Sequence, residues 1–262
     1  MLSKEEKQLA PQDAPQENKR KDGESKREPG EESGRASYIF EQIRVPRGCL
    51  GYLVADPKTK LAALVDPELE MVEPMLDAVF RHNLRLAYVI DTHTHADHHS
   101  GAGEIRKKTV AKVVMHEKAP ASLVDIRVVD GDRLYLGELA IKFRHTPGHA
   151  KDLMTVVLPG RILTADALLI GSCGRTDLLN GNATQQYHTL YSTFASMPDE
   201  LEVWPGHDYK GLEHTTLGEQ KKNNAKMNFP SEEEFVRYMD SENPKHLSDV
   251  QQLADALKAN ML

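Results

Sequence analysis

The feature that most constrains this chain is a cluster of histidine and aspartate residues that directly follows an apolar run. The apolar run covers residues 84–90, and the cluster reads Asp91-Thr92-His93-Thr94-His95-Ala96-Asp97-His98. An apolar run of this length predicts a buried strand, so the cluster lies where that strand passes into a loop. Loops on a rigid scaffold commonly carry the chemistry of a protein.

The spacing within the cluster favours metal binding. Residues two apart on extended backbone point the same way, so His93 and His95 can converge, while Asp97 and His98 begin the next turn. Neutral imidazole is the commonest metal ligand, and packing alone does not explain so many ligand types in so short a segment. The alternative is an ordinary surface or core histidine, and we assign His99 to that kind.

Three more residues of ligand type follow predicted strands. His149 stands in Thr146-Pro147-Gly148-His149, Asp166 in Leu163-Thr164-Ala165-Asp166, and His207 in Trp204-Pro205-Gly206-His207-Asp208. Each of them lies at a strand exit, which is also the position of the first cluster. The pattern therefore predicts one site assembled from several strand ends.

The remaining pattern predicts two β-sheets with helices on their outer faces. Short β-prone runs punctuated by Pro and Gly predict strands at 38–45, 50–55, 61–65, 112–115, 126–129, 133–136, 139–143, 154–158, 161–164 and 201–204. Helical spacing predicts helices over 71–79, near 103–108, at 185–194, at 213–227 and at the C-terminal end. Strands in runs with helices between them indicate an α/β fold, an αββα sandwich of two mixed β-sheets flanked by helices.

We divide the chain into a tail and one catalytic domain. Residues 1–36 hold eight basic and nine acidic residues with almost no aromatic or branched side chains, which predicts a disordered charged tail. Residues 37–262 form the predicted catalytic domain, and about 213–262 form a helical C-terminal extension. The formal net charge of −7 argues against nucleic acid as a partner, since phosphate binding needs surplus Lys and Arg on one face.

Cysteine content and hydropathy indicate the compartment. The chain has two cysteines, too few for a disulfide framework, and no stretch that looks like a secretory signal. No run approaches the roughly 20 apolar residues of a membrane-spanning helix, so we expect no membrane association. We expect a cytoplasmic protein, with the mitochondrial matrix as the alternative in a eukaryote, and we keep a homodimer open beside a monomer.

Over residues 38–210 these motifs resemble the metallo-β-lactamase superfamily, which carries H-x-H-x-D-H, a later His, a bridging Asp and a final His. A longer stretch looks like the signature of the persulfide dioxygenases: Asp166-Ala167-Leu168-Leu169-Ile170-Gly171-Ser172-Cys173-Gly174-Arg175-Thr176-Asp177. The segments 207–211 and 232–236 are similar to the same family, which extends the resemblance to about residue 240.

The resemblance implies a mononuclear iron enzyme of sulfur metabolism and hydrogen sulfide detoxification. It implies one Fe(II) per chain on His93, His149 and Asp166, and oxidation of glutathione persulfide with O2 and water to sulfite and glutathione. Two histidines and one carboxylate on one face of an iron leave positions open for substrate and O2. Tyr209 is expected to hydrogen-bond at the metal as a catalytic residue, with half-buried packing as its alternative.

Other residues of the motifs receive roles from the same resemblance. His95, Asp97, His98 and His207 match the ligands of a second metal in two-zinc relatives, or instead orient the first ligands through hydrogen bonds. Arg175 and Cys173 are expected to bind substrate. Their alternatives are an ion pair with Asp177 for Arg175 and a small buried apolar residue for Cys173. We assign Cys49 to packing.

A polar-rich predicted helix and four substitutions bear on the substrate. Lys221, Lys222 and Asn223 are candidates to meet glutathione carboxylates, with a solvated helix face as the alternative. The chain departs from the family's common pattern at Ser100, Ala150, Ala165 and Leu178, where Thr, Thr, Gly and Phe are usual. None of these positions is a predicted ligand.

The nearest rival activity is that of a hydroxyacylglutathione hydrolase of the glyoxalase II type, which uses two metals to cleave a thioester. Its cofactor would be zinc, one or two ions per chain. That family carries a longer helical C-terminal domain than the segment that follows His207 here, which favours the dioxygenase. A non-catalytic sensor and a nuclease on the same fold are weaker alternatives, because every ligand is retained and the chain is acidic.

Overall fold

The computed structural model describes residues 37–178 and 180–242. The tail predicted for residues 1–36 lies outside the described residues, and so does the end of the predicted C-terminal extension, residues 243–262. The division into tail and catalytic domain therefore stays a prediction. Within the described residues, no helix is both long and apolar enough to cross a membrane.

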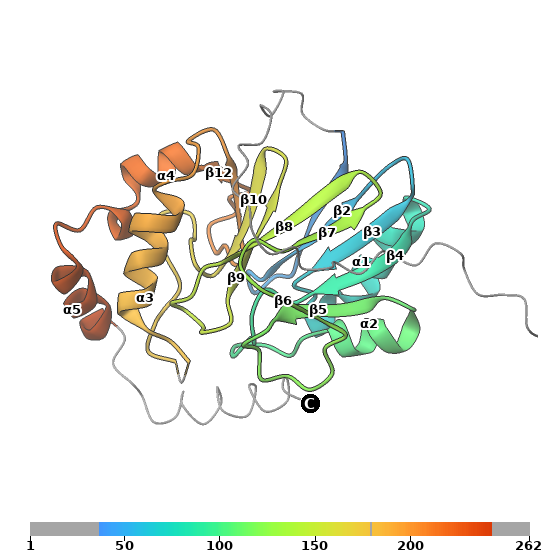
Figure 1. Cartoon of the computed structure of the whole chain (residues 1–262), viewed down its shortest axis with the longest axis horizontal. Helices are drawn as coiled ribbons and strands as arrows, with labels where there is room; N and C mark the ends of the chain where they lie inside the picture. Colours follow the sequence, from blue (N-terminus) through green and yellow to red (C-terminus); the bar gives the residue numbers. More distant parts are fainter. Residues whose placement is uncertain (1–36, 179, 243–262) are drawn as a thin grey trace, which may run out of the picture. The chain divides into compact units, whose positions relative to one another are not determined.

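The described residues form two six-stranded sheets (Figure 1). The first sheet has the order β1 (Ile39–Arg44), β2 (Leu50–Ala55), β3 (Leu61–Val65), β4 (Arg85–Ile90), β5 (Lys112–His116) and β6 (Ile126–Val128). The second has the order β12 (Thr215–Thr216), β11 (Glu202–Pro205), β10 (Arg161–Ala165), β9 (Met154–Leu158), β8 (Leu139–His145) and β7 (Arg133–Leu136). Both sheets mix parallel and antiparallel pairs, as the sequence predicts.

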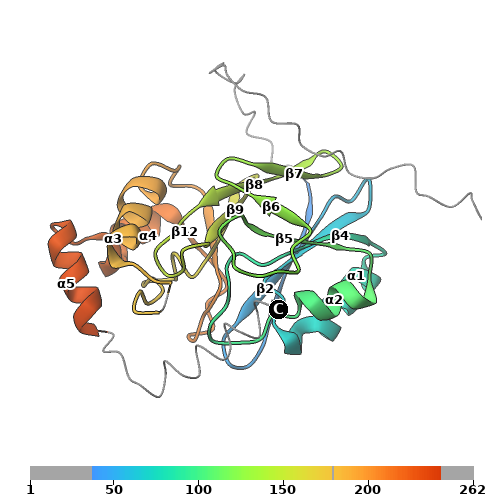
Figure 2. The ribbon, with the colours of Figure 1, turned by 60° about the horizontal axis from the view of Figure 1, so that its bottom comes forward.

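The helices cover the outer faces of the two sheets (Figures 1 and 2). Helices α1 (Val72–Arg81) and α2 (Ala102–Lys108) pack on the first sheet. Helices α3 (Ala183–His188), α4 (Leu217–Asn223) and α5 (Glu232–Glu242), with a π-helical turn at Thr189–Phe194 and short 3-10 turns at Leu69–Met71 and Ala225–Met227, complete the list. Helices α3, α4 and α5 pack on the second sheet, and the turn at Leu69–Met71 packs on the first. The αββα sandwich is confirmed.

A separate apolar cluster lies between the two sheets. It joins Tyr52 and Tyr88 of the first sheet to Phe143 and Val156 of the second, and all four are almost fully buried. Alternating residues of each strand therefore face either this inner core or a helix layer, which fixes the pairing register. The strand ends that carry the predicted ligands are held by packing on both faces of each sheet.

Helix α1 illustrates how local sequence sets these boundaries. Val72, Met75 and Val79 recur at helical spacing and are buried against the first sheet. The helix ends because Asn83 adopts a left-handed backbone with φ of 52°, which lets Leu84 N donate to the Val79 carbonyl. The chain then turns directly into β4, and β4 delivers the histidine cluster.

The helix predicted over residues 213–227 is wrong at both ends. Thr215–Thr216 instead form strand β12 against β11, and α4 begins only after Thr216, whose hydroxyl accepts from Glu219 N at 3.2 Å. The helix stops at Asn224, whose side-chain amide donates to the Ser172 carbonyl at 2.9 Å. The pairing of β12 with β11 and the contact of Asn224 with the Ser172 loop outweigh the helix propensity of residues 213–227.

Candidate metal centre

The predicted ligands converge from four strand exits. His93, His95, Asp97 and His98 follow β4, His149 follows β8, Asp166 follows β10 and His207 follows β11. In the structure these residues form three groups of neighbouring ligand atoms. The groups also include three residues that the sequence analysis did not assign as ligands. The groups are His93, His149 and Asp166; Cys49, Asp97, His98 and His207; and Asp66, Asp91 and His95.

The first group is buried and compact. The ligand atoms of His93, His149 and Asp166 all lie within 4.8 Å of one another, and each residue is at most 7% exposed. His149 Nε2 lies 3.5 Å from Asp166 Oδ2, and the rings of His93 and His149 stand nearly perpendicular at 5.2 Å. This places two imidazoles and one carboxylate around one point.

Hydrogen bonds fix which nitrogen of His93 carries the proton. The Thr92 hydroxyl donates its single hydrogen to Asp66 Oδ2 at 2.8 Å, so it accepts from His93 Nδ1 at 3.0 Å. His93 Nε2 then holds a lone pair, and this buried atom has no hydrogen-bond partner among the described residues. A buried polar atom of this kind calls for a partner, and a metal ion supplies one.

His149 is oriented in the same way from the second sheet. Its Nδ1 donates to the Arg175 carbonyl at 2.8 Å, which leaves Nε2 as the ligand atom. The backbone N of His149 donates to Gln186 Oε1 at 3.0 Å, so helix α3 holds the ligand loop. Metal-binding histidines usually donate their second nitrogen to an oxygen in this manner. The three residues fit a metal ion by the chemistry of their donor set.

The charges of the group suit a cation. Burial, with the neighbouring His95 and His149 rings, holds the pKa of His93 well below its usual range, so the ring is neutral. Burial acts to raise the pKa of Asp166, but His207 outweighs it and holds that pKa well below the usual range. His207 Nδ1 donates to Asp166 Oδ1 at 2.7 Å. The group therefore presents a neutral His93 imidazole and an anionic Asp166 carboxylate.

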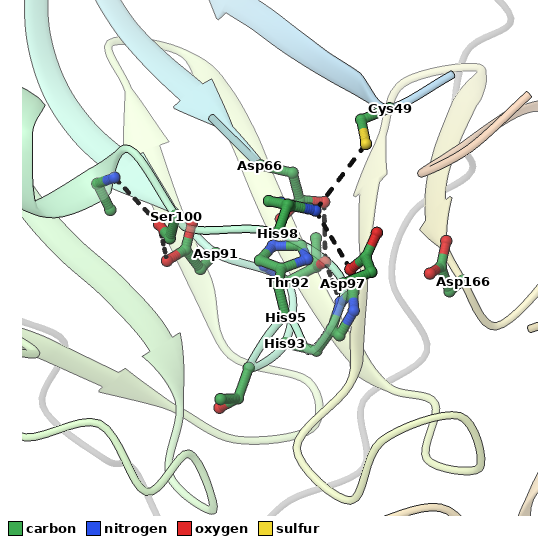
Figure 3. Close-up of polar contacts among 12 residues, drawn as sticks. Cys49, Asp66, Asp91, Thr92, His93, His95, Asp97, His98, Ser100 and Asp166 are labelled. Atoms are coloured by element: carbon green, nitrogen blue, oxygen red, sulfur yellow. Dashed lines mark hydrogen bonds and ion pairs between the residues drawn. The ribbon is translucent and has the colours of Figure 1, made fainter. Parts of the chain in front are cut away.

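Three buried carboxylates hold the cluster loop. Asp66 accepts from the backbone N of Thr92 at 2.7 Å, and Asp152 accepts from the N and hydroxyl of Thr94 at 2.9 and 2.7 Å. Asp91 accepts from the Ser100 hydroxyl at 2.7 Å (Figure 3). Ser100 thus supplies the same hydroxyl that Thr would supply at this position. His95 Nε2 lies 3.3 Å from Asp66 Oδ1, and the His95 ring lies 4.2 Å from the His93 ring, so His95 contacts both the supporting acids and the first group.

Sequence reasoning missed Asp66, Asp152 and Cys49. Asp66 directly follows β3, and a polar residue directly after a buried strand is the signal that also located the histidines. Asp152 carried no such signal, because its partner Thr94 is distant in sequence. Cys49 was assigned to packing, and although it is buried, its sulfur lies 3.9 Å from His98 Nδ1.

A cavity of about 270 Å³ opens beside the first group. Its lining residues are Ala96, Asp97, His149, Asp166, Leu169, Cys173, Gly174, Arg175, Leu178, His207 and Tyr209. The cavity therefore brings metal-ligand candidates and the predicted substrate residues together. A second hollow, lined partly by Arg44 and Asp208, shares Tyr209 with it.

The predicted substrate residues occupy different environments in this cavity. Arg175 makes a two-pronged ion pair with Asp177 at 2.6 Å. This ion pair is the alternative to substrate binding that the sequence suggested for Arg175. Burial raises the pKa of the Cys173 thiol to about 12, so this cysteine is uncharged. Tyr209 is 76% exposed and its ring stacks on His207 at 6.0 Å. Their roles toward a substrate stay predictions.

The candidates for glutathione carboxylates lie away from the cavity. Lys221 donates to Asp199 Oδ1 and to the Met197 carbonyl, both at 2.6 Å, and Asn223 donates to Glu219. Neither these residues nor Lys222 lines the cavity. Helix α4 instead supports the signature loop, because Gln220 Oε1 accepts from Gly171 N at 2.8 Å.

Comparison with known proteins assigns the chain to a class. Residues 44–207 match the model of the metallo-beta-lactamase superfamily, and the chain belongs to this superfamily. Over 229 residues it is 35% identical to the mitochondrial persulfide dioxygenase ETHE1 of Bos taurus, covering 86% of this chain and 89% of that protein. Within the superfamily, the chain is a member of the persulfide dioxygenase family.

A solved structure and a more distant relative agree with that assignment. The crystal structure of ETHE1 from Myxococcus xanthus superposes with a TM-score of 0.80 at 39% identity, covering 85% of this chain and 98% of that one. The hydroxyacylglutathione hydrolase of Nitrobacter hamburgensis is 34% identical, but over 61% of this chain and 62% of its own length. The rival family thus matches less of the chain.

Proposed function

We propose that this protein is a mononuclear iron persulfide dioxygenase. The reaction is GSSH + O2 + H2O → GSH + HSO3⁻ + H⁺, where GSSH is glutathione persulfide. The outer sulfur is oxidised, O2 is reduced, and the sulfur–sulfur bond breaks. The observation that carries the proposal is the first group, in which His93 and His149 turn their Nε2 lone pairs toward Asp166 beside a cavity.

His93, His149 and Asp166 would hold the iron. When bound, Fe(II) supplies a redox-active centre with open positions for O2 and a sulfur ligand. Thr92 and the Arg175 carbonyl keep the imidazoles in the ligand tautomer, and His207 holds one oxygen of Asp166 so that the other faces the site. The residues therefore arrive oriented, which lowers the cost of assembling the reacting groups.

The cavity walls would position the persulfide. Ala96, Leu169 and Leu178 supply apolar surface that limits water near the reacting sulfur. The Arg175 guanidinium, aligned by Asp177, supplies positive charge for the anionic persulfide or a glutathione carboxylate. Tyr209, at the mouth of the cavity, carries a hydroxyl that can donate to substrate, and this is the catalytic role we propose for it.

Thioester hydrolysis by two zinc ions is the second candidate. The bridging role that it requires of Asp166 competes with the 2.7 Å hydrogen bond between Asp166 Oδ1 and His207 Nδ1. The greater coverage of persulfide dioxygenase relatives also supports the dioxygenase. We therefore propose one iron as the resident metal, with zinc as the alternative.

One anaerobic preparation tests both candidates. Metal analysis of the full chain should find about one iron per chain, and the protein should consume O2 with glutathione persulfide and release sulfite. Zinc-loaded protein that hydrolyses S-lactoylglutathione without O2 uptake would overturn the proposal. Arg175→Lys keeps the charge but loses the two-pronged geometry, so we expect a higher KM for persulfide at unchanged iron content.

Compartment and assembly are also proposals. We propose a cytoplasmic protein, with the mitochondrial matrix as the alternative because the bovine relative is described as mitochondrial. Cell fractionation distinguishes the two. We carry a homodimer as the alternative to a monomer, and sedimentation of the purified full chain decides between them.

A further inference from the structure

Gln186, a fully buried residue of helix α3, hydrogen-bonds to both ligand loops of the second sheet. Its side-chain Oε1 accepts from the backbone N of His149 at 3.0 Å, and its Nε2 donates to the Ala167 carbonyl at 2.6 Å. Ala167 directly follows Asp166 in the chain. One side-chain amide therefore joins the segment that carries His149 to the segment that carries Asp166.

An amide suits this position because its two partners have opposite needs. The backbone N–H of His149 requires an acceptor and the Ala167 carbonyl requires a donor, so only one orientation of the Gln186 amide satisfies both. A carboxylate of the same length could accept but not donate, and an apolar side chain could do neither. His149 and Ala167 are both buried, so their backbone polar groups depend on partners within the protein.

Helix α3 also contacts the residues just before this histidine. Asn182 N, at the start of the helix, donates to the Gly148 carbonyl at 2.7 Å, and the Thr189 hydroxyl, just after the helix, donates to the Pro147 carbonyl at 2.7 Å. A Cβ on Gly148 would lie only 2.5 Å from Gln186 Cα, so the absence of a side chain at Gly148 permits this close approach. The loop and the helix are therefore fastened together along their length of contact.

The resulting clamp fixes the spacing of two proposed metal ligands. His149 Nε2 lies 3.5 Å from Asp166 Oδ2. Two ligand atoms that are each about 2.1 Å from one ion lie about 3.0 to 3.4 Å apart when the bond angle is about 90 to 109°. The observed spacing is therefore close to the one that a shared ion requires.

A second link between the same two loops acts on the imidazole ring rather than on the backbone. His149 Nδ1 donates to the Arg175 carbonyl at 2.8 Å, and Gly174 N donates to the Asp166 carbonyl at 2.8 Å. This link orients the ring, whereas the bond from His149 N to Gln186 places the backbone from which the ring projects. Both links are needed, because a shift of the backbone moves the Nε2 atom even when the ring keeps its orientation.

We propose that Gln186 is a positioning residue of the metal centre, which sets the separation of His149 and Asp166 and so raises the affinity of the site for its ion. The residue acts through these two ligands, since it is not among the described residues that line the cavity. The inference rests on the metal centre of the proposed function, but it requires neither that the ion is iron nor that the substrate is a persulfide.

Anaerobic titration of the full chain with Co²⁺ tests the inference, because the visible d–d absorption of bound Co²⁺ reports its coordination geometry. Gln186→Met keeps the length of the side chain and removes both hydrogen bonds. We expect about 10- to 100-fold weaker Co²⁺ binding and a changed d–d spectrum. Gln185→Met makes the same substitution at the exposed neighbour on the same helix, and this matched control should bind Co²⁺ as the wild type does.

Two further variants make the measurement specific. The absorption that His93→Ala removes belongs to the first group, and only that absorption is compared between proteins. Gln186→Asn keeps an uncharged amide but is one methylene shorter, so it cannot reach both partners and should also weaken binding. It decides the outcome if thermal unfolding shows that Gln186→Met does not fold.

The readouts separate a positioning role from a purely structural one. If Gln186 only stabilises the fold, its variants will melt at lower temperature but bind Co²⁺ with the affinity and spectrum of the wild type while folded, and this result overturns the inference. Wild-type protein without an absorption that depends on His93 overturns it together with the metal centre. Weaker Co²⁺ binding by the Gln186 variants of a protein that does not oxidise persulfide would support the inference and overturn the proposed dioxygenase.

Discussion

The two ligand groups differ in where their hydrogen bonds go. In the first group, His93 Nδ1 donates to the Thr92 hydroxyl and His149 Nδ1 donates to the Arg175 carbonyl. These bonds turn the two Nε2 atoms toward a common point. In the second, His98 bonds to Asp97 and Cys49 within the group, whereas His207 bonds both to Asp97 and to Asp166 of the first group. The first group therefore turns two Nε2 atoms toward a point where a metal can bind, whereas most polar atoms of the second group already share hydrogen bonds.

This difference teaches which site should hold a resident ion. A buried nitrogen without a partner costs free energy that metal binding recovers. A group whose members already share protons must release them to bind a cation, so its affinity depends more steeply on pH and on the ion. We therefore expect the resident ion in the first group.

Removal of His93 should have the largest effect. His93→Ala deletes a buried nitrogen that has no hydrogen-bond partner among the described residues, so iron and activity should disappear together. The loss should exceed the roughly 10- to 100-fold typical of changes to outer hydrogen-bond partners. Iron content and O2 uptake measure it, and normal activity in this variant would remove His93 from the ligand set.

Loss of Asp152 should have the next largest effect. Asp152→Asn weakens the bonds to Thr94, which stands between His93 and His95, so we expect about 10- to 100-fold weaker iron binding. Thermal unfolding should show a loss of about 1–3 kcal/mol, because the carboxylate is buried. Asp199→Asn, at an exposed ion pair, is the matched control and should change neither quantity.

His116 belongs to neither ligand group, so its titration should change the stability of the protein without changing the metal site. Burial, then the stacked His145 ring and Lys118, lowers its pKa to about 4, below the unfolded value of about 6.5. The unfolded state therefore binds more protons between these values, and stability falls as the pH drops from about 6.5 to about 4. His116→Asn should flatten that part of the stability profile, measured by denaturant unfolding, with unchanged iron content. An equally steep profile in the variant would contradict the assignment.

Ala165 should give the smallest effect. It precedes Asp166 with a left-handed φ of 46°, a conformation that favours glycine, and Gly is usual in the family at this position. Relief of strain and the greater entropy of the unfolded chain oppose each other in Ala165→Gly, so stability should change by less than about 1 kcal/mol. Ala165→Val should destabilise clearly, because a β-branched residue resists this conformation. Equal melting temperatures for the two variants would show that the strain is not significant.

Local pattern was sufficient to predict most of the architecture. Apolar runs bounded by Gly and Pro located the strands, and helical spacing located α1, because each signal lies within a few neighbouring residues. The exception is residues 213–227, where Asn224 ends the helix by bonding to Ser172. That contact joins residues far apart in sequence, and propensity carries no information about it.

The candidate site shows the same difference between what local sequence predicts and what long-range contacts decide. Sequence by itself determined which ligand types follow which strands, and it placed His93, His149, Asp166 and His207 at strand exits. Only the tertiary structure decided how they group: it drew Cys49 to His98, set His95 beside Asp66 and put His207 between Asp166 and Asp97. The physical reason is range, since strand and helix signals are written in neighbouring residues, whereas ligand grouping depends on how two packed sheets bring distant loops together.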